Sequence, residues 1–205
     1  MKTFDKKLFI VLFFAFIAAT VIGTLSHESG HYFTAKYWGY DARIGYGYTA
    51  LACDTTKVRA PHSGFYITLA GPLQTVITGT IGFVLLIVFR SSFFNKEKLA
   101  AWQWLLIFIA LFWLRQPANL FTYVLLNIIG EDPGGGDETS IAYHFQIPEW
   151  TIITSTGIIG AAVLLIIILK FIPVKQRLTF IISGLVGGLT GGYLWLGLLG
   201  KYILP

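Results

Sequence analysis

Charged residues and cysteine are both scarce in this chain of 205 residues. Asp, Glu, Lys and Arg make up 12% of it, against roughly 25% in soluble domains. This scarcity excludes a large soluble domain. The single cysteine, Cys53, excludes an intramolecular disulfide and also a zinc site built from several thiolates. Any metal site in this protein must therefore use histidine and carboxylate ligands.

Apolar residues dominate the composition instead. Hydrophobic residues make up 55% of the sequence, and the mean hydropathy is +0.70. The net charge of +5 comes from Lys and Arg that lie mostly beside apolar runs, where they anchor helix ends at lipid headgroups. We therefore expect no nucleic acid as a partner. The composition predicts a multi-pass integral membrane protein in contact with a lipid bilayer, and we expect it in the cell membrane.

Five apolar segments approach or exceed the length of about 20 residues that a helix needs to cross a bilayer. They cover residues 8–37, 64–89, 99–129, 149–172 and 177–203. Small residues up to Thr20 leave open a cleaved signal peptide, but the first apolar run is long for one. The pattern predicts an all-α polytopic membrane protein with about five transmembrane helices, forming a single domain over residues 1–205.

The connections between these segments differ in character. Glycines, Pro61 and strand-forming residues in the segment 39–63 predict a short β-hairpin or a re-entrant loop. Residues 130–148 are polar and predict a loop. The fifth segment is rich in glycine, which lets helices approach closely in lipid.

One short motif carries most of the chemistry. His27, Glu28 and His31 form an H-E-x-x-H pattern that continues the first apolar run without a helix breaker. Positions i and i+4 of a helix lie about 40° apart, so both imidazoles can reach one metal ion. Glu28 lies roughly 100° from His27, where its carboxylate can take a proton from a water molecule at the metal. The motif predicts one Zn²⁺ per protein molecule, with Glu28 as the catalytic base.

A catalytic zinc ion needs a third protein ligand and keeps one position open for water. Clustered acidic side chains follow the third segment, namely Glu131, Asp132, Asp137 and Glu138. A solvated polar loop would explain most of them, but one of them can complete the metal site. His144 is a further candidate ligand.

The motif and its surroundings resemble the site-2 protease family of intramembrane zinc metalloproteases. The resemblance rests on the H-E-x-x-H motif in an early transmembrane helix, on Gly71-Pro72 in the next segment, and on an Asn-containing third segment followed by a Gly-rich stretch with aspartates. The family's three-helix core corresponds to residues 8–137, and residues 149–203 add further helices. The resemblance implies a zinc metalloendopeptidase, a hydrolase that cleaves transmembrane protein substrates in regulated intramembrane proteolysis.

The resemblance also bears on the third ligand. In the family this ligand is an aspartate in an Asn-x-x-Pro…Asp-Gly pattern. Here Gly130 stands where a proline is usual after Asn127, and Glu138 rather than glycine follows Asp137. The Gly-rich approach favours Asp137, and Asp132 is the alternative.

Family members hold their substrate as an extended strand beside a membrane-associated hairpin or loop. The resemblance therefore suggests Tyr46 and Tyr48 as substrate-binding residues, although a plain connecting hairpin explains them equally well. Asn119 can hydrogen-bond the substrate backbone or an oxyanion, with helix packing as its alternative role. Arg115 is a charge within the third segment, which either pairs with an acid or lies near a water-filled cavity, unless it snorkels to the interface.

Two other functions fit the same residues. A catalytically silent relative would bind membrane-protein clients and keep zinc structurally, but the intact Glu28 argues against it. A small metal transporter would use the motif and the acidic loop as an ion path, but no inverted repeat is visible in the five segments. The distribution of Lys and Arg favours a cytoplasmic N-terminus, whereas many members of the resembled family have their active site nearer the cytoplasm.

Overall fold

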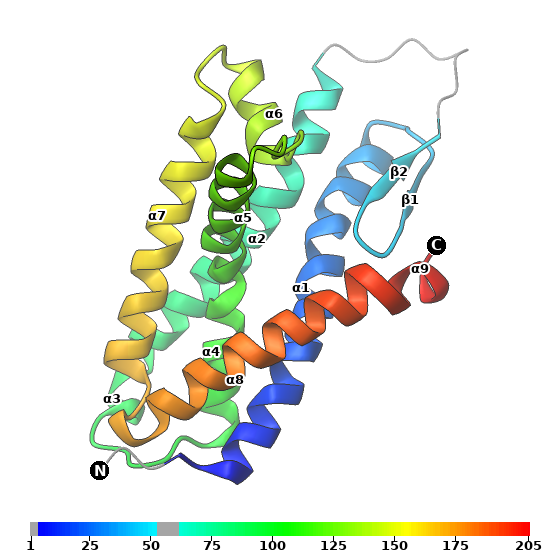
Figure 1. Cartoon of the computed structure of the whole chain (residues 1–205). Helices are drawn as coiled ribbons and strands as arrows, with labels where there is room; N and C mark the ends of the chain where they lie inside the picture. The colour runs from blue at the N-terminus through cyan, green and yellow to red at the C-terminus, as the bar shows by residue number, and fades with distance from the viewer. Residues whose placement is uncertain (1–3, 53–61) are drawn as a thin grey trace.

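The protein is a bundle of long helices with one small β-hairpin, and the computed structural model describes residues 4–52 and 62–205 (Figure 1). Its helices include five segments that are long and apolar enough to cross a membrane: Lys6–Tyr37, Ser63–Val88, Ala101–Ile129, Trp150–Phe171 and Val174–Ile203. The predicted fold class, an all-α polytopic membrane protein with a hairpin after the first helix, is confirmed.

Helix α1 (Lys6–Tyr37) carries the H-E-x-x-H motif in its last third. The helix begins where Asp5 Oδ1 accepts a hydrogen bond from the Leu8 N–H at 3.1 Å. It ends before Gly39, which has a φ of 77°, a left-handed conformation that costs glycine little. No break separates the apolar run from the motif, so the helix that spans the membrane also presents the two histidines.

The hairpin consists of β1 (Ala42–Ile44) and β2 (Thr49–Leu51), which pair antiparallel. The Gly45 N–H closes the turn by donating to the Tyr48 carbonyl at 2.8 Å. Tyr46 and Tyr48 therefore lie in the turn and not in the strands. The remainder of the predicted segment 39–63 includes residues 53–61, which lie outside the described residues.

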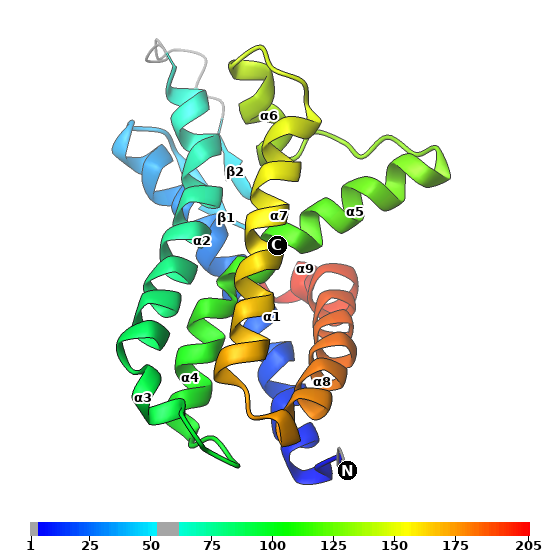
Figure 2. The same cartoon turned by 90° about the vertical axis from the view of Figure 1, so that its left-hand side faces the viewer.

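The third membrane segment changes direction. It consists of α4 (Ala101–Ala110), the 3₁₀ turn η1 (Leu111–Leu114) and α5 (Arg115–Ile129). Pro117 has no N–H to donate to the preceding turn, which favours a bend at this point. Figure 2 shows α5 leaving the bundle sideways.

The other helices complete the bundle around α1. Helix α2 (Ser63–Val88) packs against α1 and α4, and the short α3 (Arg90–Phe93) follows it. Helix α7 (Trp150–Ile166) ends in the π-helical turn η2 (Ile167–Phe171) and packs against α5. Helix α8 (Val174–Gly192), extended by η3 (Tyr193–Leu199) and α9 (Gly200–Ile203), crosses α1 (Figure 1).

Residues 130–148 and the glycines of the fifth segment can now be compared with their predicted structures. The predicted polar loop 130–148 contains a helix, α6 (Asp137–His144), whose first turn is acidic and whose last turn holds His144, as the helix dipole favours. In the fifth segment, Gly187 and Gly191 lie against the backbone of α1, so the prediction of close helix contact is confirmed there.

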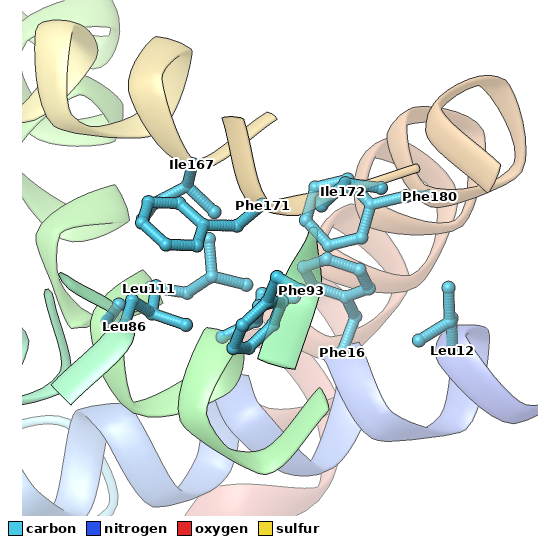
Figure 3. Packing of buried hydrophobic residues seen from close by; sticks show 11 residues of the cluster. Leu12, Phe16, Leu86, Phe93, Leu111, Ile167, Phe171, Ile172 and Phe180 are labelled. Atoms are coloured by element: carbon cyan, nitrogen blue, oxygen red, sulfur yellow. The ribbon is translucent and has the colours of Figure 1, made fainter. Parts of the chain in front are cut away.

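The apolar core lies at the end of the bundle opposite the hairpin. Its buried side chains come from the first half of α1, the end of α2, the segments α3, α4 and η1, the turn η2 with the residue after it, and α8 (Figure 3). They include Phe16, Leu86, Phe171 and Phe180. The polar residues of the motif are thus separated from this packed region and lie at the hairpin end.

Candidate metal centre

Three ligand atoms converge between α1 and the start of α6. Asp137 Oδ2 lies 2.9 Å from His27 Nε2 and 3.2 Å from His31 Nε2. The two Nε2 atoms are 3.1 Å apart. The ligands of a tetrahedral zinc site, each 2.0–2.1 Å from the metal, are about 3.3 Å from one another. The spacing of these three atoms therefore suits one small divalent cation.

The outer nitrogen of each imidazole acts as a donor. His31 Nδ1 lies 2.7 Å from the backbone carbonyl of Ile67, and a carbonyl can only accept. His27 Nδ1 lies 3.0 Å from Thr75 Oγ1, whose own proton goes to the Gly71 carbonyl. Both neutral imidazoles thus carry their proton on Nδ1 and present the lone pair of Nε2 inward.

This arrangement fits a metal. Two inward lone pairs and a carboxylate oxygen meet at about hydrogen-bond distance, and with both histidines neutral no proton lies between them. A cation at their centre satisfies all three. The donor set of two imidazoles and one carboxylate is one that zinc accepts, and it leaves a fourth position open. His27, His31 and Asp137 could accordingly hold a metal ion.

Asp137 reaches the histidines because it begins α6. Burial acts to raise the pKa of its carboxyl group, but its interactions with the two imidazoles outweigh burial and hold the pKa well below its usual range. The Asp137 side chain is therefore ionised and available as a ligand. Its approach runs through Gly134, Gly135 and Gly136, the first of which has a φ of 71°.

Gly71 makes room for the two imidazoles. A Cβ on this residue would lie 2.7 Å from His27 Nε2 and closer still to His31 Nε2. A Cβ on Gly30 would likewise meet the Ala70 carbonyl, so α1 and α2 are in close contact where the motif lies. Glycine at position 71 is thus required by the ring positions and not by the backbone of α2.

Glu28 is buried beside the three ligand atoms and is bonded to the hairpin. Thr49 Oγ1 of β2 lies 3.0 Å from Glu28 Oε2 and 3.0 Å from the Glu28 carbonyl oxygen, so it donates to this residue. Within the described residues Glu28 Oε1 takes no hydrogen bond. The carboxylate is therefore oriented through one oxygen while the other is free to exchange a proton.

A cavity of about 590 Å³ lies between the residues of the motif, α5 and β2, all of which line it. Arg115, Asn119, Thr122 and Tyr123 line it from one face of α5, since they are spaced by four, seven and eight residues. Asn119 Nδ2 donates to Glu138 Oε1 at 3.0 Å. The cavity is thus large enough for a peptide segment and is lined by the motif on one side and by a polar helix face on another.

No protein-family model, curated protein or solved structure matches this chain. The residues of the site are therefore the basis for its function.

The other predicted site residues lie at different distances from this centre. Tyr48 and Asn119 line the cavity, whereas Tyr46 packs against Gly200 and its carbonyl accepts from Trp195 Nε1 at 2.7 Å. The rival ligands are engaged elsewhere. Asp132 Oδ1 accepts from the Gly134 N–H within its own loop, and the His144 ring stacks on Phe65.

Three residues of the site were not singled out from the sequence as parts of it. Thr75 and Thr49 orient His27 and Glu28, and the Ile67 carbonyl orients His31. Thr75 alone left a signal, because it lies four residues after Gly71 in an apolar helix, where a polar side chain is costly unless it is paired. Thr49 and Ile67 left no such signal, because their contacts with Glu28 and His31 arise only when β2 and α2 pack against α1.

Proposed function

We propose that this protein is an intramembrane zinc metalloprotease that hydrolyses peptide bonds within or next to transmembrane segments. The observation that carries the proposal is the convergence of His27 Nε2, His31 Nε2 and Asp137 Oδ2, with Glu28 buried beside them, in helices apolar enough to span a membrane. The resemblance of the motif to the site-2 protease family supports it. Transmembrane proteins are the substrate class, and the membrane is the cell membrane.

Glu28, Thr49 and the partners of the two histidines have separate roles in the proposed hydrolysis. When bound, zinc supplies a Lewis acid that polarises the scissile carbonyl and lowers the pKa of water. Glu28 accepts the proton of the attacking water and returns it to the leaving amine. Thr49 keeps the Glu28 carboxylate in place through one oxygen, while the outer partners of His27 and His31 fix both rings.

The hairpin supplies a place for an extended substrate. The bonds Gly45 N–H to Tyr48 O and Ala52 N–H to Asp41 O make Arg43 and Ala50 a hydrogen-bonded pair. The backbone groups of the alternate residues of β2, Thr49 and Leu51, therefore point away from β1, and no bond from another described residue reaches them. Both residues line the cavity, so a peptide that adds a strand at this edge passes beside Glu28.

Asn119 is the proposed contact on the other wall of the cavity. Its Nδ2 is held by Glu138, and its amide oxygen has no partner in the described ranges 4–52 and 62–205. This oxygen can accept from a substrate backbone N–H once the substrate helix has unwound. Tyr48 borders the same space, whereas Tyr46 supports the turn behind it.

The test compares wild type with Glu28→Gln on a transmembrane peptide reporter reconstituted in vesicles. We expect Glu28→Gln to retain zinc and to lose cleavage by about 10²- to 10⁴-fold, because only the proton transfer is removed. Glu97→Gln, at an exposed ion pair with Lys175 far from the motif, is the matched control and keeps full activity.

Two outcomes contradict the proposal. Tight binding of reporters by the zinc-loaded wild type without any cleavage would favour a silent client-binding relative. Zinc-dependent metal flux into vesicles without cleavage would favour a transporter.

A further inference from the structure

Arg115, the first residue of α5, contributes a cation to the wall of the cavity. Its side chain lines the same space as His27 and Glu28, and it lies close enough to His27 to interact with it electrostatically. Its Nε atom is buried and has no hydrogen-bond partner among the described residues. Within the part of the protein that the structure describes, no carboxylate forms an ion pair with this guanidinium.

The carboxylates that share the cavity are engaged by other groups. Asp137 meets the two imidazoles, Glu138 accepts from Asn119, and Glu28 accepts from Thr49. A guanidinium with a buried, unpaired nitrogen in a membrane helix is costly. An anion that enters the cavity and pairs with this guanidinium would offset the cost.

The position of Arg115 also shows where such an anion would lie. Asn119, Thr122 and Tyr123 continue the polar face of α5 from Arg115 outward along the cavity. A peptide that lies between this face and the edge of β2 therefore passes Arg115 close to the residues that would hold zinc. A planar guanidinium recognises a carboxylate through two parallel hydrogen bonds, which gives direction as well as charge complementarity.

We propose that Arg115 is a specificity-determining residue that selects substrates with a carboxylate near the scissile bond. This inference rests on the proposed function, since it assigns the substrate class of the same site. The carboxylate comes from an acidic side chain within the bound segment or from the free carboxyl terminus of the substrate. Neutral peptides bind without this ion pair and leave the guanidinium without a carboxylate partner.

The experiment measures binding to the zinc-loaded Glu28→Gln protein, so that it does not depend on cleavage. The probes are transmembrane peptides that carry a single Glu, scanned along the segment, each compared with the matching Gln peptide. A second pair differs in a free or amidated carboxyl terminus. We expect at least one acidic probe to bind about 10-fold or more tightly than its neutral partner, as for a buried charge-assisted hydrogen bond.

Substitutions at position 115 then assign the preference. In the Glu28→Gln background, Arg115→Gln should abolish it, Arg115→Lys should retain part of it, and Arg115→Glu should shift it towards a peptide with Lys at the same position. Arg90→Gln, at an exposed residue at the start of α3, is the matched control and keeps the preference. Zinc content and thermal unfolding of each variant separate loss of recognition from loss of the fold.

The outcomes distinguish this inference from the proposed function. Equal binding of every acidic and neutral pair, or an acid preference that survives Arg115→Gln, would overturn the role of Arg115 and leave proteolysis standing. An Arg115-dependent acid preference in a protein whose wild type cleaves no reporter would leave the carboxylate site standing and refute proteolysis.

Discussion

Thr75 Oγ1 lies 3.0 Å from His27 Nδ1, on the side of the ring opposite Asp137. Because the Thr75 hydroxyl donates to the Gly71 carbonyl, it accepts the proton of His27 Nδ1. A residue on α2 thus decides which nitrogen of a histidine on α1 is available to a metal. The orientation of the site depends on the contact between these two helices as much as on the motif.

Replacing this hydroxyl should weaken metal binding without changing the fold. Thr75→Val keeps the shape of the side chain but removes the acceptor for His27 Nδ1, and we expect zinc affinity to fall by about 10- to 100-fold. Competition with a chelator of known affinity measures the change. Thr75→Ser retains the hydroxyl and should bind zinc nearly as wild type does, and an equal loss in both variants would refute the role given to Thr75.

A side chain at Gly71 should destroy the site. The Cβ of Gly71→Ala would collide with both imidazoles, so we expect loss of bound zinc together with a lower unfolding temperature. Gly64→Ala is the matched control, because it lies in the same helix and its Cβ would meet no atom of the described residues within 4 Å. Normal zinc content in Gly71→Ala would show that the rings lie elsewhere.

The hydrogen bond from Thr49 to Glu28 should affect turnover and not metal binding. Thr49→Val removes the hydroxyl that holds the Glu28 carboxylate, and we expect kcat on a reporter to fall by roughly 10-fold or more. Zinc content and the KM of the reporter are measured alongside kcat, so that an effect on turnover is separated from effects on metal binding and on substrate binding. A change in zinc content with no change in kcat would instead make Thr49 a support of the metal centre.

The parts of the fold that follow from local patterns could be predicted. The continuous apolar run into His27 and His31 defines one helix face, and the spacing of the two residues alone brings the rings together. The hairpin followed from glycine and strand-forming residues. Helix α6 could not be predicted from its local pattern, because its eight residues are too few to show a clear hydrophobic periodicity and follow a run of glycines.

The parts that depend on tertiary contacts could not be predicted from the residues alone. Asp137 was favoured over Asp132 by a resemblance, whereas in the structure it is the start of α6 that brings its carboxylate to the histidines. Tyr46 and Tyr48 alternate in sequence as strand residues do, but they lie in the turn, where Gly45 closes the loop. The sideways course of α5 and the contacts made by Thr75 and Thr49 likewise depend on how the elements pack.

The most direct measurement is zinc analysis with X-ray absorption spectroscopy on purified wild type, Asp137→Ala and Asp132→Ala. The geometry of His27, His31 and Asp137 predicts about one zinc per wild-type molecule, bound by two imidazoles with ligands at about 2.0–2.1 Å. Asp137→Ala should lose the metal or bind it far more weakly, and Asp132→Ala should match wild type. A wild type without stoichiometric zinc, or an equal loss in both variants, would contradict a metal centre made of these three residues.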